Sequence, residues 1–355
     1  MTEIDAVDVR RLKIPLSEPY HLSHATVESF DVILFEVVTL SGRRGTGEVT
    51  PLTGYSRESG SEAWSRLTDV ATVLPGLTES EARQRIEDRL DGYRFTRTAV
   101  DCALETAFHD PIESVAAPVV GITSTDIPAE QAVVDVTEQL EAGFETVKVK
   151  IGFDPETDAA RLSEVVSETP GDIEFRVDAN QGYTLEEARR FLAGVPTERL
   201  QLLEQPLPTG NLHDHATLHS DFEVPVMLDE EISSAADLEA VADVNAAGLV
   251  KFKLMKAGGW RTLQSLVRRA NELDFGVVVG NGVQSDVACI YEAIIWQRAN
   301  LPLAGEFNGW RKQRQALTSG GLQFQDGRLR WDGTSIEFEP DVVAQHTVER
   351  AQYGN

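Results

Sequence analysis

Lysine is scarce in this sequence, and most of it is gathered in two short apolar runs. The chain has seven lysines against twenty-five arginines. Lys148 and Lys150 lie in TVKVKIG, and Lys251, Lys253 and Lys256 lie in VKFKLMKAGG. Residues two apart in a β-strand point to the same face, so each run would present a pair of lysines together. Because lysine can give up its proton and arginine cannot, these pairs are candidates for acid–base chemistry.

Three carboxylates follow β-rich runs that lie between the two lysine runs. They are Asp178 in IEFRVDA, Glu204 in LQLLEQP and Asp229 in VPVMLDE. Carboxylates are hard oxygen ligands, which suits Mg²⁺, with Mn²⁺ as an alternative, and water in the remaining positions. Such a metal can chelate a substrate carboxylate and stabilise the enediolate that forms when the weakly acidic α-proton leaves. The pattern therefore predicts metal-assisted removal and return of a proton by lysines.

The order of these residues argues for a site more strongly than any one of them. A single lysine at a strand end is usually solvated, and an aspartate after a strand, such as Asp178, is more often a helix cap or turn former. Here Lys150, Asp178, Glu204, Asp229 and Lys253 follow one another at intervals of 24 to 28 residues. The acids supply the opposite charge that a buried lysine pair needs. Crowding by the second lysine and by the metal is expected to lower the pKa values of the lysines toward neutrality.

Other polar residues occupy equivalent positions and are expected to bind substrate or support the site. They are Asn180, Glu230, Lys251, Asn281, Gln284 and Glu306.

The elements that must position these residues alternate regularly from about residue 116. Short β-rich runs recur about every 25 residues, with amphipathic helical patterns between them, at 118–122, 146–152, 173–179, 200–206, 224–230, 248–254, 275–281 and 301–307. Eight strands alternating with helices predict an α/β fold with parallel pairing, and the count favours a closed (β/α)₈ TIM barrel. An open doubly wound sheet is the alternative, but no glycine-rich nucleotide loop follows any strand. Active sites of such barrels lie at the C-terminal ends of the strands.

Three segments are expected along the chain. Residues 1–115 mix strand and helix patterns and predict an α+β capping domain, and residues 116–320 form the barrel. Residues 321–355 contain a hairpin signal at Asp326-Gly327 and are expected to return to the capping domain.

Composition narrows the function classes. The formal net charge of −26 argues against nucleic-acid or anionic-membrane partners. An acidic, lysine-poor surface that retains arginine is typical of a salt-rich cytoplasm and predicts a halophilic source. No apolar signal core and no run of about eighteen apolar residues is found, so a cytoplasmic protein is expected. Cys102 and Cys289 show neither metal-ligand spacing nor a disulfide framework.

Five motifs resemble those of the enolase superfamily, and specifically of its muconate-lactonizing subgroup (the mandelate racemase/muconate lactonizing enzyme family). They are VKVKIG, RVDANQGY, LEQPL, VMLDEEI and KFKLMKAGG. The resemblance implies that Asp178, Glu204 and Asp229 bind Mg²⁺. It implies that Lys150 and Lys253 are the acid–base pair, with Lys148 tuning its neighbour.

The same resemblance has implications for the N-terminal domain and for assembly. Two loops, around Tyr20 to His24 and around Thr53 to Tyr55, would lie over the barrel mouth and select the substrate. By analogy with the family, a homo-oligomer is expected.

Three departures bear on which reaction of the family is expected. The mandelate-racemase branch uses a histidine on strand seven, and no histidine occurs between His219 and His346. Dipeptide epimerases carry Asp-x-Asp after strand eight, whereas GEFNGW stands here and is closer to the cycloisomerase segment. Gln284 stands where subgroup members often have glutamate.

The leading prediction is a Mg²⁺-dependent isomerase acting on a small carboxylate with an abstractable α-proton. It would racemise or epimerise an amino-acid derivative, or cycloisomerise a muconate-like acid. Elimination by a dehydratase or o-succinylbenzoate synthase type of lyase would use the same residues. A Schiff-base aldolase with Lys150 or Lys253 as nucleophile is a second alternative, and a non-catalytic carboxylate-binding protein is a third.

Overall fold

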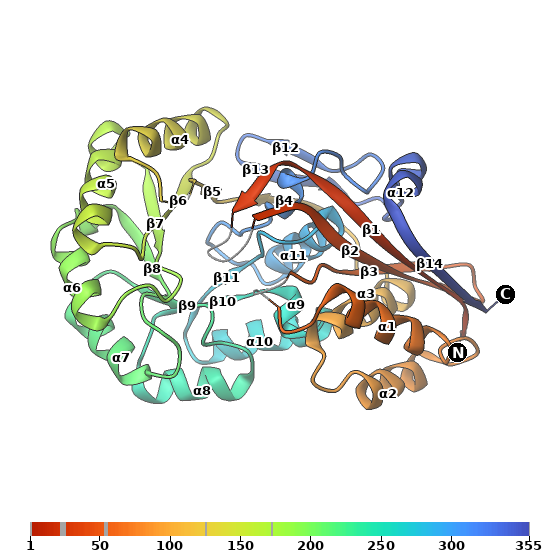
Figure 1. The fold of residues 1–355 in the computed structure, drawn as a ribbon. Coiled ribbons are helices and arrows are strands. Elements are labelled where there is room, and N and C mark those ends of the chain that lie inside the picture. Colours follow the sequence, from red (N-terminus) through yellow and green to blue (C-terminus); the bar gives the residue numbers. More distant parts are fainter. Residues whose placement is uncertain (1, 22–25, 53–55, 125, 172, 355) are drawn as a thin grey trace.

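The computed structural model describes residues 2–21, 26–52, 56–124, 126–171 and 173–354 (Figure 1). Its N-terminal part is an antiparallel sheet of order β14-β1-β2-β3 with three helices beside it. The elements are β1 (Ile4–His21), β2 (Thr26–Thr39), β3 (Arg44–Val49), α1 (Gly60–Ala71), α2 (Glu79–Arg89) and α3 (Arg94–His109).

Local sequence explains how these helices begin and pack. The hydroxyl of Ser59 accepts a hydrogen bond from the N–H of Glu62 and caps α1. A capping box of Thr78 and Glu81 starts α2. Helix α3 contacts β3 closely because Gly45 and Gly47 have no side chains there, and a Cβ at either position would collide with the α3 backbone.

The second part is a curled, fully parallel sheet of seven strands in the order β11-β10-β9-β8-β7-β6-β5. Helices α4 to α8 lie along its outer side (Figure 1). The elements are β4 (Ser114–Pro118), β5 (Gly121–Ile122), α4 (Ala129–Glu141), β6 (Thr146–Lys150), α5 (Pro155–Glu168), β7 (Glu174–Asp178), α6 (Leu185–Ala193), η1 (Thr197–Arg199), β8 (Leu200–Glu204), α7 (Leu212–Asp221), β9 (Val226–Leu228), α8 (Ala235–Val244), β10 (Leu249–Phe252), α9 (Leu254–Ala257), α10 (Trp260–Glu272), β11 (Gly276–Val279) and α11 (Asp286–Arg298).

The predicted closed barrel is not confirmed, because the expected eighth strand is missing from this sheet. Residues 301–307 form only an isolated parallel bridge between Val119 and Gly305. Pro302 has no N–H to donate to a ladder. The segment still lies between the two edges, since the N–H of Glu306 donates to Val279 O at 3.0 Å and the N–H of Gly305 donates to Pro118 O at 2.9 Å.

The C-terminal part runs from η2 (Gly309–Lys312) to the last strand and contacts both sheets. The hairpin signal is matched by β12 (Gln323–Gln325) and β13 (Arg328–Asp332), which pair antiparallel around Asp326-Gly327, both at positive φ. Strand β13 also pairs with β4. After α12 (Pro340–His346), β14 (Thr347–Gly354) pairs antiparallel with β1 in the N-terminal sheet.

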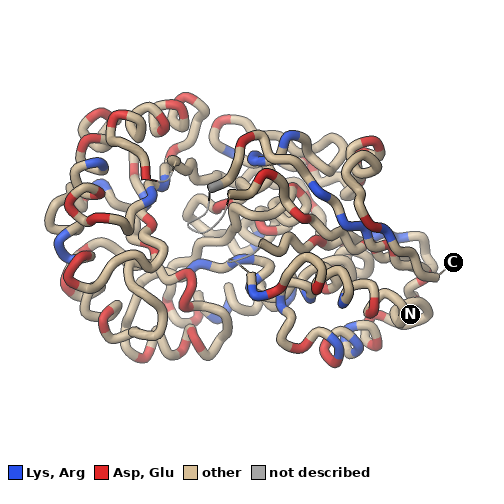
Figure 2. The backbone as a smooth tube through the Cα atoms, viewed as in Figure 1, with Lys and Arg blue, Asp and Glu red and all other residues tan. Residues whose placement is uncertain are grey.

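The described residues bear on three further expectations. Cys102 in α3 and Cys289 in α11 are both buried free thiols. Asp and Glu positions are distributed over both parts of the molecule rather than gathered in one patch (Figure 2). Among the described helices, none combines the length and the apolar character needed to cross a membrane.

Candidate active site

Strand register brings the candidate residues level with one another. Lys150 is the Cα partner of Asp178, and Asp178 is the partner of Glu204. Glu204 pairs with Met227, so Asp229 lies two residues beyond the pairing position and on the same face as Met227. The parallel sheet therefore gathers at its C-terminal edge the residues that are spread over a hundred positions in the sequence.

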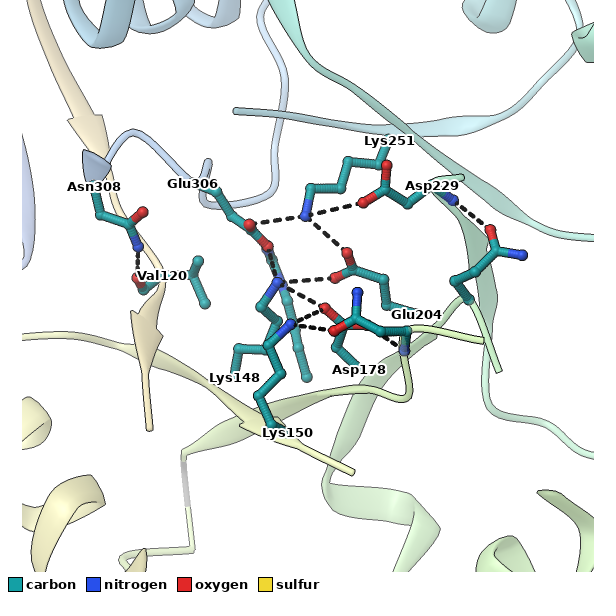
Figure 3. A network of polar contacts seen from close by, with 12 residues as sticks. Val120, Lys148, Lys150, Asp178, Glu204, Asp229, Lys251, Glu306 and Asn308 are labelled. Atoms are coloured by element: carbon teal, nitrogen blue, oxygen red, sulfur yellow. Dashed lines mark hydrogen bonds and ion pairs between the residues drawn. The ribbon is translucent and has the colours of Figure 1, made fainter. Parts of the chain in front are cut away.

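Lys148 and Lys251 are enclosed by acids from several strands, and we call them the inner lysines. Lys148 Nζ lies 2.5 Å from Glu306 Oε1, 3.1 Å from Asp178 Oδ2 and 3.2 Å from Glu204 Oε2. Lys251 Nζ lies 2.7 Å from Glu204 Oε1, 2.8 Å from Glu306 Oε2 and 3.7 Å from Asp229 Oδ2. Figure 3 shows the two ammonium groups approaching Glu204 and Glu306 from different strands. Both lysine side chains are only 2% exposed.

The pKa values of the two inner lysines are raised rather than lowered. Burial on its own lowers the pKa of Lys148, but the Glu204 and Glu306 carboxylates more than offset this effect, and the pKa is raised. The pKa of Lys251 is raised well above its usual value by the same opposition of burial and carboxylates. The inner lysines are therefore fixed cations at neutral pH, and the reason is that their carboxylate neighbours outnumber their lysine neighbours.

Lys150 and Lys253, which we call the outer lysines, lie nearer the mouth of the sheet. Lys150 Nζ lies 2.6 Å from Asp178 Oδ2 and 2.6 Å from Asn180 Oδ1, and its side chain is 21% exposed. Lys253 Nζ lies 2.5 Å from Asp229 Oδ2. Because β7, β8 and β9 separate β6 from β10, the outer lysines flank the acids from two sides.

Two further residues complete the cluster around Asp229. Asn180 Nδ2 donates to Glu230 Oε1 at 3.2 Å, while Glu230 Oε2 is buried without a hydrogen-bond partner among the described residues. Burial, followed by the nearby Asp229, raises the pKa of Glu230. Lys256 Nζ lies 3.1 Å from Asp229 Oδ1. Lys256 was not among the residues predicted for the site, although the scarcity of lysine in the chain was a signal that pointed to it.

The donor set of Asp178, Glu204 and Asp229 fits a hard divalent cation by its chemistry. Lysines hold the pKa values of Asp178 and Asp229 below the usual range although burial opposes this, so both are anionic at neutral pH. Burial, followed by the charge of Asp178, raises the pKa of Glu204 to about 7. A divalent cation would relieve this crowding of like charges.

Not every predicted residue joins this cluster. Asn281 exchanges hydrogen bonds with the backbone of Val283 in its own loop. Gln284 is buried and donates to Glu292 in α11 rather than to a strand-end residue. Tyr20 contacts Lys312 through its ring. His24 and Tyr55 lie outside the described residues.

A separate group of potential metal ligands was missed by the sequence analysis. Glu79, Glu105 and His109 bring one ligand atom each within 4.8 Å of one another on α2 and α3. Arg83 and Arg261 already bind these carboxylates, each with two bonds of 2.6 to 2.8 Å. The group is therefore a charge-balanced link between helices α2, α3 and α10.

The pattern of strand-end residues can be compared with known proteins. Residues 131–342 match the family described as enolase C-terminal domain-like, which is more than half of the chain. The chain belongs to the enolase superfamily. The resemblance carried by the five strand-end motifs is thereby confirmed, and all residues of the cluster from Lys148 to Glu306 lie within the matched range.

Individual members of the superfamily are similar over nearly the whole chain. The L-Lys-D/L-Arg epimerase of Methylococcus capsulatus is 28% identical over 356 residues, covering 92% of this chain and 96% of its own. The structure of a dipeptide epimerase from Cytophaga hutchinsonii, complexed with Mg and the dipeptide D-Ala-L-Val, has a TM-score of 0.89 at 21% identity and covers 99% of this chain and 100% of its own. The muconate lactonizing enzyme of Pseudomonas fluorescens has a TM-score of 0.86 at 20% identity, covering 98% and 99%.

Proposed function

We propose that this protein is a racemase or epimerase that removes the α-proton of a carboxylate substrate and returns a proton to the opposite face. The observation that carries the proposal is the placement of Lys150 and Lys253 on two sides of one row of acids. A single base could exchange a proton, but inversion at carbon is most direct with one lysine on each face. The epimerase named among the relatives supports the same reaction class.

The proton balance requires the outer lysines to start in opposite states. The neutral lysine takes the α-proton and becomes an ammonium, and the electron pair of the C–H bond moves into the enediolate. The other lysine, initially an ammonium, then gives its proton to the opposite face of the α-carbon. The lysines exchange states over one turnover, so the reverse reaction starts from the state that the forward reaction leaves.

Asp178, Glu204 and Asp229 would hold Mg²⁺, with Mn²⁺ as the alternative. When bound, the cation supplies the positive charge that stabilises the enediolate. The inner lysines hold the carboxyl groups of Glu204 and Glu306 in place. Asn180 Oδ1 accepts a 2.6 Å hydrogen bond from Lys150 Nζ and fixes the position of this ammonium group. We assign Glu230 a supporting role beside Asn180.

Two further assignments belong to this proposal. Residues 301–307 occupy the eighth position of the ring, which is supported by their hydrogen bonds to Val279 and Pro118 at the two sheet edges. The substrate is an amino-acid derivative. Glu306 is already engaged by both inner lysines, so it is a poor partner for the ammonium group of a free dipeptide.

Deuterium uptake tests the proposed reaction. The Mg²⁺-loaded protein is incubated in heavy water at molar salt with N-acyl amino acids, dipeptides, acid sugars and muconates. Gain of one deuteron with inversion is the expected result, and Lys150→Arg combined with Lys253→Arg is expected to abolish it. Lys13→Arg is the control, since Lys13 pairs with Asp31 on the N-terminal sheet.

Other outcomes of the same experiment identify the alternatives. Loss of water from the substrate would indicate a lyase. Conversion of a muconate to a lactone of equal mass apart from incorporated deuterium, with no racemisation of any amino-acid derivative, would indicate a cycloisomerase. An adduct trapped by borohydride without any need for Mg²⁺ would indicate a Schiff-base aldolase. Inversion that survives in the double variant would contradict the mechanism.

A further inference from the structure

One buried carboxylate outside the strand-end cluster binds the backbone that follows Lys150. Asp158 lies in the first turn of α5 and is 0% exposed. Its Oδ2 accepts hydrogen bonds from the N–H of Gly152 at 3.0 Å, from the N–H of Phe153 at 2.9 Å and from the Tyr183 hydroxyl at 2.6 Å. A carboxylate is costly to bury, and these bonds offset the cost only while both loops stay in place.

The other oxygen of Asp158 connects it to the main chain of the lysine itself. Asp158 Oδ1 accepts a hydrogen bond from Arg161 Nη2, an ion pair within α5. The same nitrogen donates to Lys150 O at 2.9 Å, and Arg161 Nη1 donates to Ile127 O at 3.3 Å. The Arg161 side chain is only 5% exposed. Arg161 therefore holds the point of the main chain from which the Lys150 side chain begins.

Tyr183 extends the same contacts to the loop after β7. This loop carries Asn180, whose Oδ1 accepts the 2.6 Å hydrogen bond from Lys150 Nζ. Tyr183 is buried, and its N–H donates to Pro206 O at 3.1 Å. Burial, followed by the bond to Asp158, raises the pKa of Tyr183, so the hydroxyl keeps its proton and acts as the donor. Asp158 thus links the loop that follows Lys150 to the loop that holds its amide partner.

The two loops also touch backbone to backbone. A Cβ on Gly152 would lie 2.3 Å from Ala179 O, and a Cβ on Gly182 would lie 2.1 Å from Gly152 O. Gly152 has a φ of 100°, a conformation that side chains rarely adopt. Because close-packed groups transmit displacements, a change at Asp158 should move both loops together.

The other outer lysine is held by different residues. Lys253 is the N-cap of α9, and the N–H of the next residue, Leu254, donates to Glu292 of α11 at 2.8 Å. Strands β8 and β9 separate β7 from β10 in the sheet. A disturbance around Asp158 should therefore reach Lys150 and not Lys253.

We infer that Asp158 is a positioning residue for Lys150 and acts through Arg161 and Tyr183. The three side chains hold Lys150 Nζ where it meets one face of the α-carbon, while Lys253 is positioned independently on the other face. This inference rests on the proposed function for the reaction itself, and it adds that each proton-transferring lysine has a support of its own. A displacement of about 1 Å can cost about a hundredfold in rate, so loss of the support should be measurable.

Exchange with heavy water, measured separately for each enantiomer, tests the inference. Lys150→Met identifies the enantiomer whose α-proton faces Lys150, since that variant cannot exchange it. For this enantiomer, exchange should fall about tenfold in Tyr183→Phe and about a hundredfold in Asp158→Asn, which cannot accept bonds on both sides. Exchange of the other enantiomer should stay at the wild-type rate. Tyr291→Phe is the matched control, because Tyr291 is equally buried and its hydroxyl donates to Thr46 O at 2.7 Å, away from both loops.

A second measurement reports on the position of the lysine without any reaction. The chain has seven lysines, so protein labelled with ¹³C at lysine Cε gives few enough NMR signals to assign by single Lys→Arg variants. Tyr183→Phe should shift the signal of Lys150 and leave that of Lys253 in place. Tyr291→Phe should shift neither signal.

Two results would overturn the inference. One is an equal loss of exchange for both enantiomers in Tyr183→Phe, which a general loosening of the fold would give. The other is a Lys150 signal and an exchange rate that both stay at their wild-type values in Tyr183→Phe and Asp158→Asn. If no ligand exchanges with the wild-type protein while Tyr183→Phe still shifts the Lys150 signal alone, the positioning role stands and the proposed reaction fails.

Discussion

The inner and outer lysines have the same side chain and lie two residues apart in the sequence, on β6 and at the end of β10, but they have different surroundings. Lys148 and Lys251 are each 2% exposed and bridge carboxylates from several strands. Lys150 is 21% exposed, and it contacts one carboxylate and one amide. On β6, a shift of two residues therefore separates an enclosed lysine that is fixed as a cation from a partly exposed one that can meet a substrate.

This difference teaches that depth along the strand decides the role of a strand-end lysine. The inner lysines share Glu204 and Glu306, so removal of either leaves buried anions with too little compensation. When an outer lysine is removed, its carboxylate keeps another lysine: Asp178 keeps Lys148 and Asp229 keeps Lys256, both at 3.1 Å. We therefore expect stability to depend on the inner pair and proton transfer on the outer pair.

The largest effect is expected when one outer lysine is removed. Lys150→Met should lower racemisation by about a thousandfold, the usual scale for loss of a positioned acid or base. The α-proton of the enantiomer that faces Lys253 should still exchange with heavy water, because that base remains. Proton NMR of each enantiomer measures the exchange, and chiral chromatography measures the inversion. Lys253→Met should show the opposite selectivity, and equal loss of exchange for both enantiomers in both variants would contradict the division of roles.

The second effect concerns stability and compares one inner with one outer lysine on β10 and just after it. Lys251→Met should lower the free energy of unfolding by about 3 to 5 kcal/mol, because Glu204 and Glu306 lose a bridging cation. Lys253→Met should cost about 1 kcal/mol, because its partner Asp229 keeps Lys256 at 3.1 Å. Urea unfolding in metal-free buffer measures both. Equal costs would break the distinction between inner and outer lysines.

A buried carboxylate without a lysine sharpens the comparison. Glu48 of β3 accepts hydrogen bonds from the N–H groups of Ser285 and Ala288 at 2.8 and 3.2 Å and from the Ser285 hydroxyl. Burial raises its pKa from 4.5 to about 7, whereas Lys148 and Lys251 overcome burial and hold the pKa of Glu306 far below its usual value. Hydrogen bonds alone thus do not replace the missing cation.

The sign of the Glu48 effect on stability follows from that raised pKa. Below pH 4.5 the carboxyl is protonated in both the folded and unfolded chains, and no penalty exists. As the pH rises from 4.5 to about 7, the unfolded chain ionises first, so stability is lost, by up to about 3 kcal/mol.

Glu48→Gln should remove this dependence. The free energy of unfolding of the variant relative to wild type should therefore improve between pH 4.5 and pH 8, which urea titrations at both pH values can measure. Glu62→Gln in the first turn of α1 is the matched control. Parallel curves for wild type and Glu48→Gln would contradict the shift.

Most of the candidate site could be predicted, because it depends on the spacing of residues within a strand and on the order of the strands along the chain. Lysines two apart, and acids at intervals near 25 residues, are local in sequence, and parallel register turns that order into proximity. The inner lysines' raised pKa values could not be predicted, because Glu306 reaches them from a segment about 55 residues beyond Lys251.

The missing eighth strand was also beyond the sequence. Leu301, Leu303 and Phe307 made 301–307 resemble a strand in composition, but Pro302 cannot donate to a ladder and pairing depends on both edges of the sheet.

The smallest effect on stability is expected for the ion pair between Lys13 and Asp31, which lies on the surface. Lys13 Nζ lies 2.8 Å from Asp31 Oδ2, as close as the inner lysines lie to their acids, but the Lys13 side chain is 47% exposed. Asp31 also accepts hydrogen bonds from Arg11 Nε at 2.9 Å and from Arg11 Nη2 at 2.7 Å, so it keeps a partner when Lys13 is removed. Lys13→Met should therefore cost about 0.5 kcal/mol or less in urea unfolding, and salt should reduce even that.

The salt dependence extends the contrast between surface and interior. The cost of Lys251→Met should change little between low and molar salt, because ions do not reach a pair that is enclosed by protein. A cost for Lys13→Met as large as that for Lys251→Met would mean that distance, rather than burial and shared partners, sets the strength of lysine–carboxylate pairs in this protein.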